Sequence, residues 1–177
     1  MRKLIPVAVM VMAAGAAQAE PFRSGPVFTD FGKTAPVDSD LPIPKGTVFK
    51  VAFDVAKGAE PGEINRTFDS AARFINMHVS AGVPARNIHL AVVVHGTAGW
   101  DVTTDAVYRA HNADKPNGSA AAVSALLERG VRIYLCGQSA ARMGIAKADL
   151  IPGVKLSLSA MTAHALLQQQ GYTLNPF

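Results

Sequence analysis

The sequence predicts an α/β protein in which a mainly parallel sheet of about five strands is covered by helices on both sides. From residue 47 onward, apolar strand-like segments alternate with segments whose apolar residues recur at helical spacing. The segment IHLAVVVHG (88–96) is almost continuously apolar, which is typical of a parallel strand buried on both faces. Alternating strands and helices form βαβ units, in which crossover helices join parallel strands.

The first half of this domain contains two predicted strands and one long helix. VFKVAFDVA (48–56) is rich in β-branched and aromatic residues and predicts the first strand. Residues 64–82 carry apolar side chains at helical spacing, and Gly82 fits the end of that helix. After the second strand, 88–96, the polar segment 97–118 is the least regular part, with a helical turn or two expected. Long segments after a parallel strand often carry function.

The second half repeats the alternation with shorter elements. We expect helices over 119–130, 138–145 and 161–171, and strands over 131–137, 154–160 and 172–175. Gly130 fits the end of the first of these helices, and the turn pair Pro152-Gly153 precedes the fourth strand. No internal repeat and no second domain are expected.

Residues 1–19 have the layout of a secretory signal peptide. Arg2 and Lys3 precede an uncharged, mostly apolar run, which ends in the small-x-small site Ala17-Gln18-Ala19. The run is shorter than the roughly 20 apolar residues of a membrane-spanning helix. We therefore expect cleavage after Ala19, a periplasmic location and no membrane attachment afterwards; an uncleaved N-terminal anchor is the alternative.

Residues 20–46 form the second part of the N-terminal region and are rich in proline, glycine and aspartate. This composition argues against regular structure and predicts an extended arm instead of a domain. Phe22, Phe28 and Phe31 are scattered along the arm, where they can dock on the domain surface or contact a partner.

The charge balance argues against nucleic acid as a partner. The whole chain has a formal net charge of +4, and removal of Arg2 and Lys3 with the signal peptide lowers it to +2. The mature chain contains no basic run, no aromatic RNA-binding pattern and no zinc-finger spacing. Its length suffices for one domain with a full core.

Cys136 is the only cysteine, so an exported chain of this sequence has no internal disulfide. It lies where the third predicted strand passes into a helix, whose first N–H groups lack intrahelical partners and favour a thiolate. Such a thiolate has a lowered pKa and is nucleophilic at neutral pH. Gln138 and Ser139 can also donate hydrogen bonds to the sulfur. On residues alone, a buried apolar cysteine and half of an intermolecular bridge remain alternatives.

His95 follows the second strand and therefore lies at the same sheet edge as Cys136. In open parallel sheets, ligands bind outside the carboxyl ends of the strands. His95 is a candidate acid, base or hydrogen-bond donor there, and a structural histidine closing a turn is the alternative.

The loop HGTAG (95–99) matches neither GxGxxG nor GxxxxGK[ST], so no nucleotide cofactor is expected. No HxH or HxxxH pair predicts a metal site, and no CxxC is present.

A serine hydrolase is a weaker alternative. GQSAA around Ser139 resembles a nucleophile elbow that lacks its final glycine, and Asp149 and His164 follow in the Ser…Asp…His order. Such a short pattern arises easily by chance, and a surface charge and a helix-face polar residue explain Asp149 and His164 equally well.

Six features from the second strand onward carry a resemblance to a known family. They are VVVHG (92–96), Tyr108, KPN (115–117), ALLERGVRIYLCGQSAARMGI (125–145), DLIPGV (149–154) and LLQQQGYTLNPF (166–177). Their types and order resemble the DsrE/DsrF-like (DsrE/TusD-type) sulfur-relay family. The most specific is GV-x-I-x-x-C-G-Q-S, followed here by Gly144-Ile145.

The resemblance implies a flavodoxin-like three-layer α/β/α domain over residues 47–177 and homo-oligomers, often trimers or hexamers. It also implies that Cys136 carries sulfur as a persulfide, which it exchanges with a sulfur donor or acceptor protein or a small thiol. His95 and Gln138 match recurring family positions and complete the candidate catalytic set. The relays that modify tRNA or serve sulfur oxidation are cytoplasmic, whereas this chain carries an expected export signal. The alternative function is a non-catalytic oligomeric binding or assembly module with an inert, buried Cys136.

Overall fold

A computed structural model describes residues 21–175, so the expected signal peptide lies outside the described residues. The described chain contains a five-stranded sheet with the strand order β4-β3-β2-β1-β5. Its strands are β1 (Phe49–Val55), β2 (Ile88–Val94), β3 (Arg132–Cys136), β4 (Lys155–Ser157) and β5 (Thr173–Asn175). All four neighbouring pairs are parallel, which confirms the predicted α/β class.

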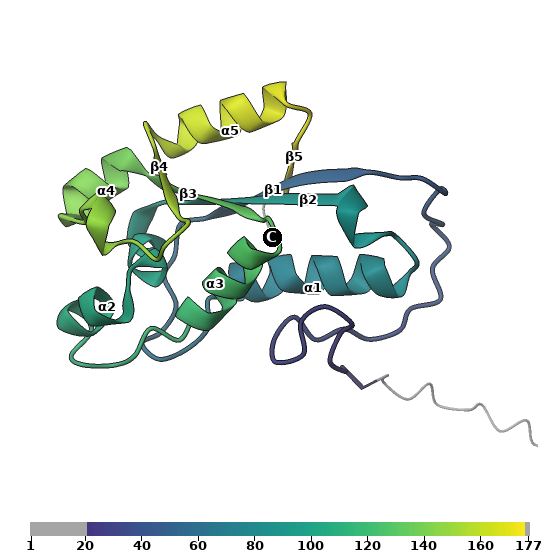
Figure 1. Cartoon of the computed structure of the whole chain (residues 1–177), viewed down its shortest axis with the longest axis horizontal. Helices are drawn as coiled ribbons and strands as arrows, with labels where there is room; N and C mark the ends of the chain where they lie inside the picture. Colours follow the sequence, from purple (N-terminus) through teal and green to yellow (C-terminus); the bar gives the residue numbers. More distant parts are fainter. Residues whose placement is uncertain (1–20, 176–177) are drawn as a thin grey trace, which may run out of the picture.

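Helices cover both faces of the sheet (Figure 1). One face carries α1 (Arg66–Ser80) and α3 (Ala120–Glu128), and the opposite face carries α5 (Ala160–Gln169). The shorter helices α2 (Asp105–His111) and α4 (Gly137–Met143) lie near the carboxyl ends of the strands. Among residues 21–175, no helix is long and apolar enough to cross a membrane.

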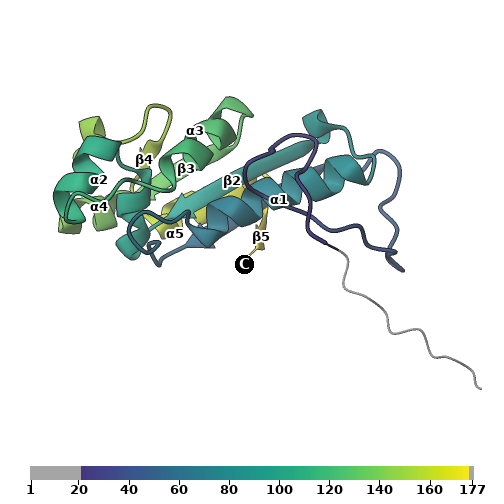
Figure 2. The ribbon, with the colours of Figure 1, turned by 90° about the horizontal axis from the view of Figure 1, so that it is seen from below.

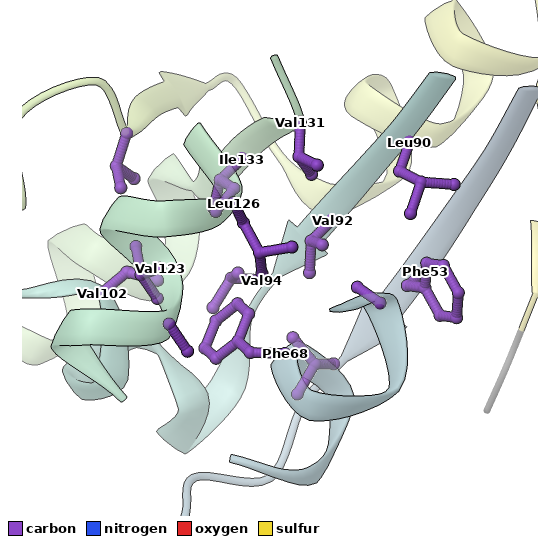
Figure 3. Close-up of a cluster of buried hydrophobic side chains, with 14 of the residues drawn as sticks. Phe53, Phe68, Leu90, Val92, Val94, Val102, Val123, Leu126, Val131 and Ile133 are labelled. Atoms are coloured by element: carbon purple, nitrogen blue, oxygen red, sulfur yellow. The ribbon is translucent and has the colours of Figure 1, made fainter. Parts of the chain in front are cut away.

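The larger part of the core fills the space between the sheet and α1 and α3 (Figure 3). Phe53, Leu90 and Val92 point from the strands toward Phe68 of α1 and Leu126 of α3. Each large apolar side chain that is fully buried contributes roughly 1.5–3 kcal/mol relative to exposure. This packing fixes the strands, and with them the positions at which they end.

A smaller apolar cluster lies between the sheet and α5. Its buried members are Ala52, Ala91, Val93, Ala163, Leu167 and Tyr172. Because successive residues of a strand point to opposite faces, Asp54 lies on the same face as Ala52, and Cys136 lies on the same face as Tyr134. Polar and reactive side chains at the carboxyl ends of the strands therefore face α5.

The fourth strand is shorter than the sequence predicts. The expected strand over 154–160 ends at Ser157, because the Ser159 hydroxyl accepts a hydrogen bond from the Thr162 N–H at 3.0 Å and caps α5. Conversely, the irregular segment 97–118 is more helical than expected, since a 3₁₀ segment over Gly96–Val102 precedes α2.

The arm crosses α1 on the side away from the sheet (Figure 2). Its described part, 21–46, has no helix or strand beyond an isolated antiparallel bridge between Arg23 and Thr34. Phe28 is buried against the core, so this arm phenylalanine docks on the domain, one of the two possibilities that the sequence leaves open. The buried Asn76 of α1 accepts hydrogen bonds from two arm N–H groups and donates to two arm carbonyls.

Candidate functional site

Cys136 ends β3, and the next residue begins α4. The residue is buried, with 6% of its surface exposed. Gly137 permits the tight passage of the chain at this point, since a Cβ there would lie 2.6 Å from the Ser157 carbonyl oxygen. The junction is therefore packed directly against the end of β4 and the segment that enters α5.

Several hydrogen-bond donors surround the Cys136 sulfur. Burial raises the pKa of the Cys136 thiol, but the N–H and hydroxyl of Ser139 and the N–H groups of Ala160 and Gln138 outweigh burial. The pKa of Cys136 is thereby lowered from its ordinary value, as expected for a thiol that reacts as a thiolate.

Ser139 connects Cys136 to the loop that follows β2. Its hydroxyl accepts a hydrogen bond from the Gly96 N–H at 3.1 Å.

Gln138 was expected to donate a hydrogen bond to the Cys136 sulfur from its side chain, but its backbone does so instead. Its exposed amide donates to the Leu158 carbonyl at 3.3 Å, so the backbone N–H of Gln138, and not its side chain, is the donor at the sulfur.

The sheet register brings His95 to Cys136. Val94 of β2 pairs with Leu135 of β3, and His95 keeps an extended backbone, so His95 and Cys136 come level at the next step. Neighbouring strands lie about 4.8 Å apart, and both side chains face α5. Two of the predicted site residues, from sequence positions 41 residues apart, are thus neighbours.

His95 belongs to a cluster that no pattern in the sequence predicts. Its Nε2 lies 3.0 Å from one carboxylate oxygen of Asp54, and Nε2 of His164 on α5 lies 2.7 Å from the other. Partial burial raises the pKa of Asp54, but the hydrogen bonds from His95 and His164 prevail and lower it. The sequence signal was Asp54 itself, an acidic residue within the otherwise apolar strand VFKVAFDVA.

The structure separates the three residues of the hydrolase pattern. His164 pairs with Asp54, whereas the Asp149 carboxylate accepts a hydrogen bond from the Ala146 N–H at 2.8 Å. Ser139 is directed to the Gly96 N–H. The hydrogen bonds of a Ser-His-Asp triad are therefore not formed by these residues.

Within residues 21–175, no group of three or more His, Cys, Asp or Glu side chains could hold a metal ion. A cavity of about 220 Å³ lies between β4 and α5, lined by Tyr134, Ser157, Leu158 and Leu166 among others.

The fold and the site together define an all-parallel α/β protein with one cysteine, of lowered pKa, at the carboxyl end of a central strand. The chain belongs to the DsrE/DsrF-like family, which matches residues 50–176. The arm lies outside the matched range.

Two solved structures share the fold. The protein of unknown function MTH1491 from Methanobacterium thermoautotrophicum is 18% identical, with a TM-score of 0.55 over 73% of this chain and 99% of that one. The ychN protein from E. coli is 19% identical, with a TM-score of 0.52 over 73% of this chain and 100% of the other. No match was found among curated proteins.

Proposed function

We propose that this protein is a periplasmic sulfur carrier that holds sulfane sulfur as a persulfide on Cys136. The observation that carries the proposal is the hydrogen bonding that lowers the pKa of the only thiol, within the range matched by the DsrE/DsrF-like family. The expected signal peptide, residues 1–19, supports the location.

The transfer proceeds without an external oxidant. The Cys136 thiolate attacks the outer sulfur of a donor persulfide, R–S–SH, and the donor S–S bond breaks as the new bond forms. The products are Cys136–S–SH and the donor thiol, R–SH. The same exchange in reverse passes the outer sulfur to an acceptor, either a protein cysteine or a small thiol.

Mass spectrometry of the mature chain tests this function. After incubation with glutathione persulfide, wild type is expected to gain about 32 Da, the mass of one sulfur, on Cys136. Reduction should reverse the gain, and the Cys136→Ala variant should not show it. An equal gain by Cys136→Ala, or no gain by wild type, contradicts the carrier function. The same spectra check cleavage after Ala19.

The second candidate is an oligomeric binding or assembly module with an inert cysteine. Two observations favour it: Cys136 is buried, and apolar side chains where the chain enters α5 are exposed, Leu158 by 72% and Met161 by 79%. Labelling of the native protein by iodoacetamide separates the two functions. A thiol that stays unreactive across neutral pH supports the module, whereas rapid labelling supports the carrier.

Both candidates include self-association, which we propose on the basis of family membership. Sedimentation velocity of wild type should show a trimer or hexamer. The Leu158→Glu variant should dissociate if this apolar surface forms the contact, and Leu41→Glu on the exposed arm is the matched control.

A further inference from the structure

Three titratable side chains from three separate elements meet at the same edge of the sheet as Cys136, and His95 is the member that lies on the strand next to it. Asp54 ends the α5-facing row of β1, His95 follows β2, and His164 reaches down from α5. One carboxylate accepts from both imidazoles, at 3.0 and 2.7 Å, and about a third of the side chains of Asp54 and His95 remains exposed. The cluster thus borders the solvent side of the site.

The cluster fixes the tautomer of His95. The pKa of Asp54 is lowered by its histidine hydrogen bonds despite partial burial, so Asp54 is ionised at neutral pH and can only accept. Nε2 of His95 therefore carries the hydrogen. In a neutral ring, Nδ1 then holds the lone pair and can take a proton.

Asp54 also fixes the orientation of His164 through its Nε2, and the other ring nitrogen of His164 is buried as a result. Its Nδ1 is buried and has no hydrogen-bond partner within the described part of the chain. An unsatisfied buried polar atom is unfavourable, so packing alone gives no reason for a histidine at this position. The hydrogen bond from His164 to Asp54 supplies one, because it orients the carboxylate toward His95.

We propose that His95 exchanges the proton of Cys136, and that Asp54 and His164 are positioning residues that hold His95 in the tautomer with a free Nδ1. A nucleophile beside a base that a third group orients is the general arrangement for activating a thiol. This inference rests on the proposed sulfur-carrier function and identifies the proton path of that site.

The proposed step balances with a persulfide donor as the only co-reactant. His95 Nδ1 takes the proton as the Sγ–H bond of Cys136 breaks, and the thiolate forms a bond to the outer sulfur of R–S–SH. The donor S–S bond breaks, and the leaving thiolate takes the proton from His95. The sum is Cys136–SH plus R–S–SH giving Cys136–S–SH plus R–SH.

Other titratable groups on this face lie away from the cluster. Lys50 and Arg132 both contact Gln170 beyond the far end of α5, and Arg132 also lies over Tyr172. Tyr134 packs into the apolar cluster beneath α5. Lys155 of β4 pairs in register with Tyr134, Arg142 lies in the last turn of α4, and the exposed His89 lies near the start of β2.

Sulfur uptake and alkylation by the mature protein test the proposal together. With glutathione persulfide at pH 7, His95→Gln is expected to slow sulfur uptake by Cys136 about a hundredfold, the lower end of the usual range for general acid–base catalysis. Asp54→Asn, which removes a positioning residue, is expected to slow it about tenfold. Both should also displace the pH profile of Cys136 alkylation by iodoacetamide. Circular dichroism checks that each variant is folded.

His164 provides a pair of variants that separates positioning from packing. His164→Phe removes the donor to Asp54 and should slow uptake several-fold, whereas His164→Gln keeps an N–H donor and should restore part of the rate. His89→Gln is the matched control, because His89 is an exposed histidine of β2, the strand that His95 follows, and it should leave rate and profile unchanged.

The outcomes distinguish this inference from the proposed function. If wild type takes up sulfur on Cys136 but folded Asp54→Asn keeps the wild-type rate and alkylation profile, the proton path is wrong while the carrier function stands. If wild type takes up no sulfur, the carrier function fails. A displaced alkylation profile in Asp54→Asn would still support the coupling of Asp54 and His95 to Cys136.

Discussion

Cys136 owes its lowered pKa to donors from two different junctions of the chain. The N–H groups of Gln138 and Ser139 come from the start of α4, and the N–H of Ala160 comes from the start of α5. Ser139 adds a hydroxyl, which also accepts from the Gly96 N–H. Because this one hydroxyl joins the sulfur to the loop after β2, it is the most informative single group to remove.

Replacement of Ser139 with alanine should weaken the stabilisation of the thiolate. The pKa of Cys136 is expected to rise because one donor is lost, and alkylation at pH 7 should slow by about fivefold, equivalent to about 1 kcal/mol for one hydrogen bond. The pH dependence of iodoacetamide labelling measures both effects. Ser124→Ala on α3, remote from the site, is the control. Identical labelling profiles for wild type, Ser139→Ala and Ser124→Ala would contradict the hydrogen bond from the Ser139 hydroxyl to the Cys136 sulfur.

Single residues of the site differ in how far the sequence predicts them. The sequence predicts Cys136 and His95 as candidates because each lies at the carboxyl end of an apolar strand, and the carboxyl ends of parallel strands meet at one edge. The pairing of Asp54 with His164 was not predicted. These residues are 110 positions apart, and their contact depends on α5 crossing back over β1, which no local pattern encodes. An acidic residue in an apolar strand was the available signal.

At the scale of elements, the sequence predicts which segments are strands and helices better than it predicts where they end. The fourth strand is the clearest case, since VKLSLSA has the alternation of a strand through residue 160. The hydroxyl of Ser159 instead caps α5, so the alternating pattern ends in a helix start and leaves Leu158 exposed. Periodicity does not reveal such competition between a cap and a strand.

One buried side chain makes most of the hydrogen bonds between the arm and α1, beside those of Asp69 with the Gly32 N–H and of Arg73 with the Lys33 carbonyl. Asn76 makes four hydrogen bonds to the backbone of the arm, with distances of 2.9–3.1 Å. Alanine at this position would leave those arm groups without partners, each at a cost of about 1–3 kcal/mol if they stayed buried. Release of the arm into water avoids this cost, so we expect detachment instead of global unfolding.

Asn76→Ala should therefore make residues 21–46 sensitive to protease while the domain remains folded. Limited proteolysis with mass spectrometry locates the cleavage, and urea unfolding should show a loss of at least about 2 kcal/mol as the Phe28 contact opens. Arg66→Ala, an exposed substitution on the same helix, should change neither result. Protection of the arm in Asn76→Ala would show that the phenylalanines hold it without Asn76.

At the scale of the whole molecule, folding shifts the pKa values of two carboxylates in opposite directions. Asp54 has a lowered pKa, since the histidine hydrogen bonds outweigh the effect of burial. Asp101 has a raised pKa, since its deep burial outweighs the hydrogen bonds from Asn65 and the Ala59 N–H. The fold therefore stabilises the ionised form of one group and the protonated form of the other.

These two shifts predict stability changes of opposite sign with pH. The contribution of Asp54 is present above its unfolded-state pKa and is lost as the pH falls through its lower folded-state pKa. Asp54→Asn should thus reduce stability at pH 7, by roughly 1 kcal/mol because the group is partly exposed, and the deficit should shrink in acid.

For Asp101, stability is highest when the group is protonated and falls as the pH rises through its folded-state pKa. Asp101→Asn should therefore be at least as stable as wild type at pH 7, with the difference vanishing in acid. Urea unfolding of the three proteins between pH 3 and pH 7 measures both curves. Parallel curves for all three would contradict both assignments, whereas a deficit for Asp101→Asn at pH 7 would show that its carboxylate hydrogen bonds outweigh its burial.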